Sequence, residues 1–207
     1  MSLIFFRTPD EELLEMYREA VPFMAAFVDS VDSAEATSAA LTALAERIRS
    51  MDREQRGNYL LDCSKAYSST FYIGKIVPLT ESNYLSATGN YNEENVDQVL
   101  AEYTQTGYKA ELPHTNEPAD HIGFELGFMA DVSARAAYCA ENGDVEQMIK
   151  GLKIQAAFFD GHLGLWYEPL CTRVLAKGNN NCFFHLLIAV LKVFLNEDRE
   201  LIRELTI

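Results

Sequence analysis

The chain has 207 residues, of which 48% are hydrophobic and 23% are charged, and this composition is typical of a globular protein rather than a disordered one. Its length suits one well-filled core. The formal net charge of −14 repels the phosphates of nucleic acids and anionic lipid surfaces. We therefore expect no nucleic-acid binding and no stable membrane insertion, and we expect partners that are basic.

The cysteines and the apolar segments indicate where the protein works. Its four cysteines are scattered and form no CxxC pair, which predicts reduced thiols. The first residues lack the basic start and the long apolar stretch of a secretory signal. The most apolar window, residues 182–195, is too short to span a bilayer. These features predict a cytoplasmic protein.

Helical periodicity dominates the first part of the chain. We expect a helix from Asp10 to about residue 31, with acidic residues in its first turn and Pro22 as a kink or break. Asp32 is followed by Glu35 at the spacing of a capping box, which predicts a second helix that continues through Ile48.

A third helix is predicted over residues 53–72. Residues 74–92 then form a long irregular connection, and connections of this length within a compact domain are often functional. Asn92 is expected to cap a helix that ends near Gly107. A second loop covers residues 108–116.

The second part of the chain also reads as helical. Pro118 suits the first position of a helix that ends at Gly143. A long helix follows over residues 144–176, with Pro169 bending its last turns. An almost wholly apolar helix is expected over residues 183–195, and a short charged helix after it. No strand pair and no internal repeat is visible, so the sequence predicts one all-α domain, a single-domain helical bundle, over residues 1–207.

The most informative stretch is Glu117-Pro-Ala-Asp-His-Ile-Gly-Phe-Glu-Leu-Gly-Phe-Met129. With Pro118 at the helix start, Asp120 and His121 fall in the first turn, where the helix dipole favours the carboxylate. Glu117 and Glu125 lie one turn to either side of His121, and both would favour its charged form.

Helical geometry gives this segment two apolar faces. One face is a core stripe made of Ile122, Leu126, Met129, Ser133 and Ala136. Phe124 and Phe128 lie roughly opposite, where they need either a second packing layer or a partner. Two interpretations of the segment remain open from the residues alone. It is either a capped helix start with a salt-linked histidine, or a polar site flanked by aromatic residues that takes a cationic or amide-bearing ligand.

Catalytic patterns are missing from the sequence. It contains no HExxH or paired ExxH metal spacing, no P-loop, no GxGxxG and no GxSxG. His162, with Phe158 and Trp166 one turn away on either side, is typical of a semi-buried structural histidine. We therefore predict a protein that is not an enzyme and that has no metal or cofactor. One alternative is a helical metal-dependent hydrolase that uses Asp120, His121 and Glu125, and another is a helical adaptor without peptide binding.

Three segments of the chain resemble the TorD/DmsD/NarJ family of cytoplasmic redox-enzyme maturation chaperones. Residues 117–129 are similar to the family hallmark E-P-x-D-H-[IL]-x-x-E-L-x-F-[ML]. Upstream, residues 67–84 are similar to a helix-to-loop segment that ends in P-x-x-E-S-x-[YW]. Downstream, residues 159–166 are similar to an F-x-x-H-L-x-x-W helix, with Leu165 where the family often has proline. Order and spacing agree over about residues 55–200.

The resemblance implies an all-helical chaperone of the TorD-like type. Such a protein binds the twin-arginine signal peptide of a molybdenum-cofactor oxidoreductase and holds the apo-form of that catalytic subunit until its cofactor is inserted, before export. The positions that match the family's sites are Asp120, His121, Tyr67, Phe71, Ser82 and Tyr84.

The chemistry of the signal peptide suggests which residues bind each part of it. Arginine forms forked hydrogen bonds with carboxylates, so Asp120, Glu117 and Glu125 are expected to take the basic end. His121 is expected to fix the hinge loop. The apolar run of the peptide is expected to lie in a groove lined by Phe124, Phe128, Tyr67 and Phe71. The client enzyme and the choice between monomer and dimer are not fixed by the sequence.

Overall fold

The computed structural model describes residues 2–31, 35–73, 77–86, 93–110, 116–177 and 182–206. Over these ranges the chain is helical, and its only β-type pairing is an isolated antiparallel bridge between Thr80 and His121. The prediction of an all-α protein is confirmed. None of the helices in these ranges has both the length and the apolar character needed to cross a membrane.

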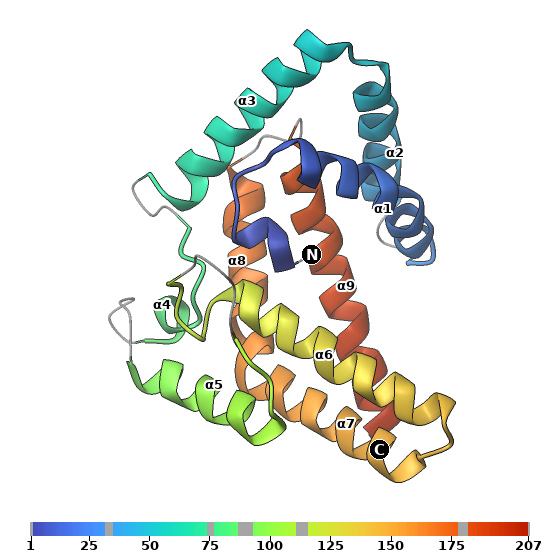
Figure 1. Ribbon diagram of the computed structural model, residues 1–207, viewed down its shortest axis with the longest axis vertical. Coiled ribbons are helices and arrows are strands. Elements are labelled where there is room, and N and C mark those ends of the chain that lie inside the picture. The colour runs from blue at the N-terminus through green and yellow to red at the C-terminus, as the bar shows by residue number, and fades with distance from the viewer. Residues whose placement is uncertain are drawn as a thin grey trace. The chain divides into compact units, whose positions relative to one another are not determined.

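Figure 1 shows the helices in chain order. They are η1 (Ser2–Phe5), α1 (Glu11–Asp29), α2 (Glu35–Ser50), α3 (Arg53–Phe71), α4 (Ser82–Leu85), α5 (Glu93–Thr106), α6 (Ile122–Glu141), α7 (Val145–Phe158), η2 (Phe159–Leu163), α8 (Gly164–Ala176) and α9 (Phe183–Thr206).

Acidic side chains cap several helix starts. Asp10, Asp52 and Asp144 each accept a hydrogen bond from the backbone N–H three residues further on, which satisfies a donor that has no partner within its helix. The predicted starts at Asp10 and Asp144 are therefore confirmed. The predicted caps Asp32 and Asn92 lie outside the described residues. Gly107 and Gly143 follow the last turns of α5 and α6 with φ of 74°, a conformation that glycine adopts without strain.

One helix prediction in the second half was wrong, and one predicted helix contains a π-helical segment. The expected break after Leu195 is absent, because no glycine or proline interrupts the chain there and Ile202 continues the buried face of α9. The long helix over residues 144–176 is helical throughout but not uniform. It is divided by η2, a π-helical segment at Phe159–Leu163.

The chain forms two compact units, each described here by itself. Unit 1 comprises residues 1–6, 79–169 and 195–207, and it contains η1, α4 to α7, η2, the start of α8 and the end of α9. Within it α6 and α7 pack side by side, and η1 lies against α6 (Figure 1). Unit 2 comprises residues 7–78 and 170–194, in which α1 packs against α2. The single domain over residues 1–207 stays a prediction.

Candidate functional site

Two of the family-like segments pair with each other through the backbone in unit 1. The N–H of Ile122 donates to the carbonyl of Leu79 (2.9 Å), and the N–H of Glu81 donates to the carbonyl of Asp120 (3.0 Å). The Oδ2 atom of Asp120 accepts a further hydrogen bond from the N–H of Ser82, at 2.9 Å. Asp120 thus fixes the start of the one-turn helix α4 from a position 38 residues away in the sequence.

This pairing changes where the motif helix begins. His121 is extended, with φ of −75° and ψ of 135°, and it is the N-cap of α6 rather than a residue of its first turn. Pro118 lies before the helix and accepts a hydrogen bond from the N–H of His121 at 3.1 Å. The predictions that Pro118 opens the helix and that Asp120 lies in its first turn were therefore wrong. The bridge to Thr80 holds residue 121 in an extended conformation that a helix cannot contain.

His121 is neutral in the folded protein. Its side chain is buried, its ring centroid lies 4.7 Å from that of Phe6, and its Nδ1 accepts a hydrogen bond from the N–H of Gly123 at 3.2 Å. Burial lowers the pKa of His121 to about 4. The expectation that Glu117 and Glu125 keep this histidine charged was wrong, because the loss of hydration on burial disfavours the protonated ring.

The second apolar face of α6 is packed within unit 1. Phe128 is fully buried, and its ring centroid lies 4.4 Å from that of Phe158 and 5.0 Å from that of Tyr103. Phe124 lies 4.9 Å from Phe6, the residue that follows η1. Of the two options that the sequence left for these phenylalanines, the structure has the second packing layer.

Three carboxyl groups are buried close to the motif, and we call Glu81, Asp120 and Glu125 the carboxyl cluster. Burial raises the pKa of Asp120, although the hydrogen bonds from Ser82 oppose the shift. Burial also raises the pKa of Glu125 well above its usual range, and the charges of Glu81 and Asp120 add to this effect. Glu125 therefore retains its proton far more readily than an exposed glutamate.

Two members of the carboxyl cluster, Glu81 and Glu125, have a hydrogen-bond partner on the segment after α7. The Oε2 atom of Glu125 accepts a hydrogen bond from Nε1 of Trp166 at 3.0 Å. Nδ1 of His162 lies 3.0 Å from Oε2 of Glu81, and its Nε2 lies 3.5 Å from Oε1 of Glu102. Burial opposes the charged form of His162, but Glu81 and then Glu102 stabilise it, so that its pKa is raised overall. Protonated His162 therefore partly neutralises the negative charge of the carboxyl cluster.

Two oxygens of the cluster are left without hydrogen bonds. Among the described residues, none donates to Oδ1 of Asp120 or to Oε1 of Glu125, although both atoms are buried. Buried acceptors without a donor are uncommon, and each costs about 1–3 kcal/mol. These two atoms are therefore places where a donor from a partner would be stabilising.

Eight of the ten predicted site residues belong to unit 1, and seven of them lie at or beside the carboxyl cluster or on α6. Of these, Tyr84 is half-buried, with its ring 5.2 Å from that of Trp166. The eighth, Glu117, is exposed. Tyr67 and Phe71 lie in unit 2 on α3, where their rings are 4.9 Å apart and both contact Phe184.

The prediction of site residues missed Glu81, His162, Trp166 and Phe6. The first three occupy fixed positions of the family-like segments, namely the glutamate of E-S-x-Y and the histidine and tryptophan of F-x-x-H-L-x-x-W. Their place in those motifs was a usable signal. Phe6 is part of no motif and gave none.

The alternative of a metal site can be compared with the contacts of the side chains it would use. Asp120 binds the N–H of Ser82, and His121 binds the N–H of Gly123. In the part of the chain that the structure describes, no group of three His, Cys, Asp or Glu side chains could hold a metal ion.

Comparison with known proteins identifies the family. The profile of the family described as "Nitrate reductase delta subunit" matches residues 31–172, which is more than half of the chain and includes all ten predicted site residues. No curated protein and no solved structure matches the chain. The chain therefore belongs to the nitrate reductase delta subunit family, the maturation chaperones of molybdoenzymes that its three motifs resemble.

Proposed function

We propose that this protein is a cytoplasmic chaperone that binds the twin-arginine signal peptide of a molybdenum-cofactor oxidoreductase. It holds the apo-form of that subunit until the cofactor is inserted and so delays export. The observation that carries the proposal is the charge of unit 1, which has nineteen acidic and six basic residues, a formal charge of −13, whereas unit 2 carries −1. The family-like motif with its buried carboxyl cluster lies in the acidic unit.

The basic end of the peptide is assigned to this acidic surface. Glu117 is exposed and Glu102 is half-exposed, so they meet an arginine first. Oδ1 of Asp120 can then accept an N–H group of a guanidinium, which presents five donors in a planar fork. The positive charge of the guanidinium would also favour loss of the Glu125 proton, so that Oε1 of Glu125 can accept a second N–H group. An arginine in this position would supply the two donors that the cluster lacks.

The apolar run of the peptide is assigned to the aromatic residues around the motif. Tyr84 is accessible at this surface, whereas Phe124 lies beneath Phe6. A helical peptide would therefore take the place of Phe6 in order to reach Phe124. Phe128 supports this wall from beneath. Tyr67 and Phe71 of unit 2 stay predicted peptide-binding residues, and each is tested by its own substitution.

Peptide titration tests the proposal. A labelled twin-arginine peptide is titrated into the wild type, into Asp120→Asn and into Asp131→Asn, with binding followed by fluorescence anisotropy. Asp120→Asn keeps an oxygen for the N–H of Ser82 but removes the charge, and we expect roughly 10- to 100-fold weaker binding. Asp131, which pairs with Arg135 on the surface of α6, is the matched control, and its variant should bind like the wild type.

A second peptide tests whether the site recognises arginine. Replacing the two arginines with lysines keeps the charge but removes the forked donors, so that affinity should fall. A wild type that does not bind the twin-arginine peptide refutes the proposed function. Equal affinities of the wild type and Asp120→Asn would remove Asp120 from the site while leaving the function in place.

A further inference from the structure

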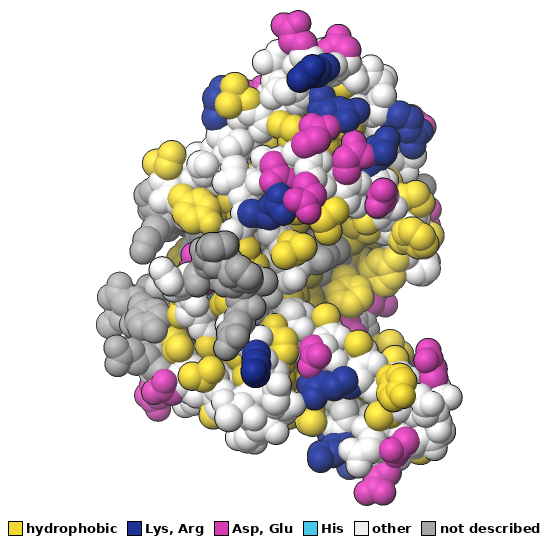
Figure 2. Space-filling model, viewed as in Figure 1, with side chains coloured by type: hydrophobic (Ala, Val, Ile, Leu, Met, Phe, Trp, Pro, Cys, Tyr) yellow, Lys and Arg dark blue, Asp and Glu magenta, His cyan; other side chains and the backbone are white. Residues whose placement is uncertain are grey.

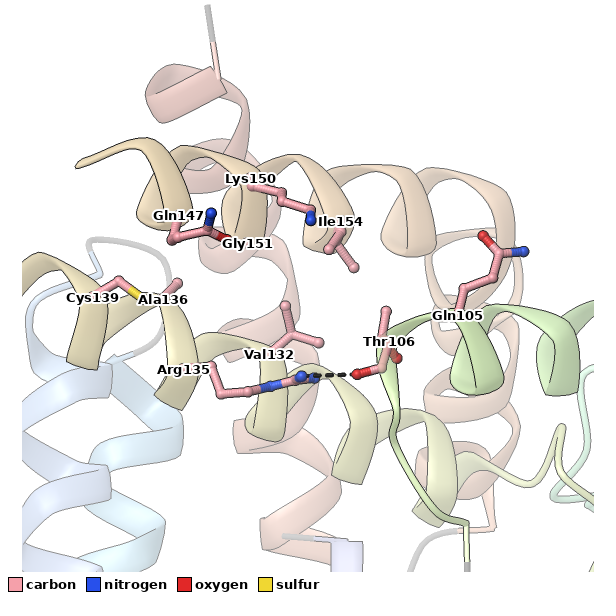
Figure 3. Close-up of a pocket in the computed structure, with 10 residues that line it drawn as sticks. All are labelled: Gln105, Thr106, Val132, Arg135, Ala136, Cys139, Gln147, Lys150, Gly151 and Ile154. Carbon is pink, nitrogen blue, oxygen red and sulfur yellow. Dashed lines mark hydrogen bonds between the residues drawn. The ribbon is translucent and has the colours of Figure 1, made fainter. Parts of the chain in front are cut away.

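A groove lies between α7 on one side and α6 with the end of α5 on the other, all in unit 1 (Figure 3). Its volume is about 270 Å³. Val132, Ala136 and Ile154 give it an apolar lining, and Arg135 and Lys150 stand at its edge. None of the residues that line it is acidic, although acidic residues outnumber basic ones three to one in this unit.

The groove continues onto the exposed face of α7. A second, more open depression of about 490 Å³ shares Lys150 and Ile154 with it and adds Ile149 and Lys153. Ile149 is 38% exposed. Together the two depressions give α7 an apolar strip that is bordered by Lys150 and Lys153 and, at the start of the helix, by Glu146.

The lysines on this face are available to a partner. Neither Lys150 nor Lys153 forms an ion pair with any residue in the described ranges. Arg135, in contrast, is engaged, because it pairs with Asp131 at 2.6 Å and donates to the carbonyl of Thr106 at 2.9 Å. The groove therefore fits an amphipathic helix that carries exposed apolar side chains beside carboxylates.

The chain itself contains such a helix at the end of α9. Leu201 and Leu205 are 53% and 54% exposed, and Glu197 and Glu204 are exposed beside them. At 100° per residue these four side chains fall within an arc of about 100°. Ile202 faces the core instead. Figure 2 shows that hydrophobic side chains reach the surface among charged ones on the face in view. The four residues at the end of α9 form an apolar and acidic stripe, which we call the acidic stripe of α9.

We propose that the acidic stripe of α9, residues 197–205, docks into the α6–α7 groove of a second copy of this chain. Leu201 and Leu205 fill the apolar groove, and Glu197 and Glu204 pair with Lys150 and Lys153. Two copies related by a two-fold axis make this contact twice, which closes the assembly as a dimer. The net charge of −14 on each copy opposes association, so the local match of charges is what permits it.

Charge reversal tests the dimer. Sedimentation velocity of the full chain between about 1 and 200 µM, the range in which small interfaces associate, should show a monomer–dimer equilibrium. Lys150→Glu with Lys153→Glu places like charges in both contacts and should weaken the dimer by at least about tenfold. Glu197→Lys with Glu204→Lys should do the same. Lys109→Glu with Lys177→Glu, an equal charge change at exposed positions outside the groove, should leave the equilibrium unchanged.

The two reversed variants provide a stringent check when they are mixed. In a mixed dimer one contact is wild type and the other has its charges exchanged, so association should return to within about threefold of the wild type. A wild type that is monomeric over the whole range overturns the proposal, as does a dimer that survives both reversals or a mixture that does not associate. Peptide binding does not enter this test, so its outcome is independent of the proposed function.

Discussion

The burial of His121 predicts a large acid-dependent loss of stability in unit 1. Its pKa is about 4 in the folded protein, against 6.5 for an exposed histidine. A folded pKa that lies below the unfolded one stabilises the protein above pH 6.5, and this stability is lost as the pH falls towards 4. The difference of 2.5 units corresponds to about 3 kcal/mol, at 1.36 kcal/mol per unit.

The substitution His121→Asn isolates this effect. Asparagine is a good N-cap and keeps an oxygen that can accept the N–H of Gly123, but it does not titrate. Trp166 is the only tryptophan of the chain and is buried in unit 1, so its fluorescence during urea unfolding reports on this unit. The difference in unfolding free energy between the wild type and the variant should shrink by about 3 kcal/mol from pH 7 to pH 4.

A second histidine provides the control, because its pH dependence has the opposite sign. The pKa of His162 is raised, so its contribution is present below pH 6.5 and is lost as the pH rises. The difference in unfolding free energy between the wild type and His162→Asn should therefore grow as the pH falls. The difference in unfolding free energy between the wild type and His121→Asn could instead stay constant from pH 7 to pH 4. The folded protein would then protonate His121 as readily as the unfolded chain does, and the reasoning from burial would be wrong.

Two further predictions concern α6. A Cβ atom at residue 123 would collide with the ring of Phe6, so Gly123→Ala should displace that ring and lower the thermal midpoint by several degrees, whereas Gly57→Ala, in open space on α3, should raise it. Glu125→Gln keeps an acceptor for the indole N–H of Trp166 and removes a carboxyl whose pKa is raised. The unfolding free energy of the wild type minus that of the variant should therefore decrease as the pH rises above about 4.5, in urea unfolding at pH 5 and pH 8.

Helix starts and ends could be predicted from the sequence where the signal acts on neighbouring residues. The acidic caps Asp10 and Asp144 act on the backbone three residues away, so the sequence alone locates those starts. The end of α6 is equally local, because Gly143 adopts a positive φ just after it. By the same reasoning, the absence of glycine and proline after Leu195 should have predicted that α9 continues through Thr206.

The site was less predictable because its contacts join distant segments. Pro118 is a valid signal for a helix start, yet the bridge between Thr80 and His121 moves that start to Ile122. Periodicity places His121 near carboxylates but cannot show that Phe6, more than a hundred residues earlier, excludes water from it. Charge states in a buried site depend on such long-range packing, so they could not be read from spacing.

The energetics of the carboxyl cluster favour a binding role over a purely structural one. Glu81, Asp120 and Glu125 are buried with a single compensating histidine, and two of their oxygens lack donors among the described residues. Apolar side chains of similar shape at such positions often give a more stable fold, since removing charges from water costs several kcal/mol per ion. Asp120 joins α4 to the start of α6, and Glu81 and Glu125 bind His162 and Trp166, but these contacts leave one oxygen of Asp120 and one of Glu125 without a partner. Under the proposed function, the cationic end of the peptide would supply the missing donors and positive charge together.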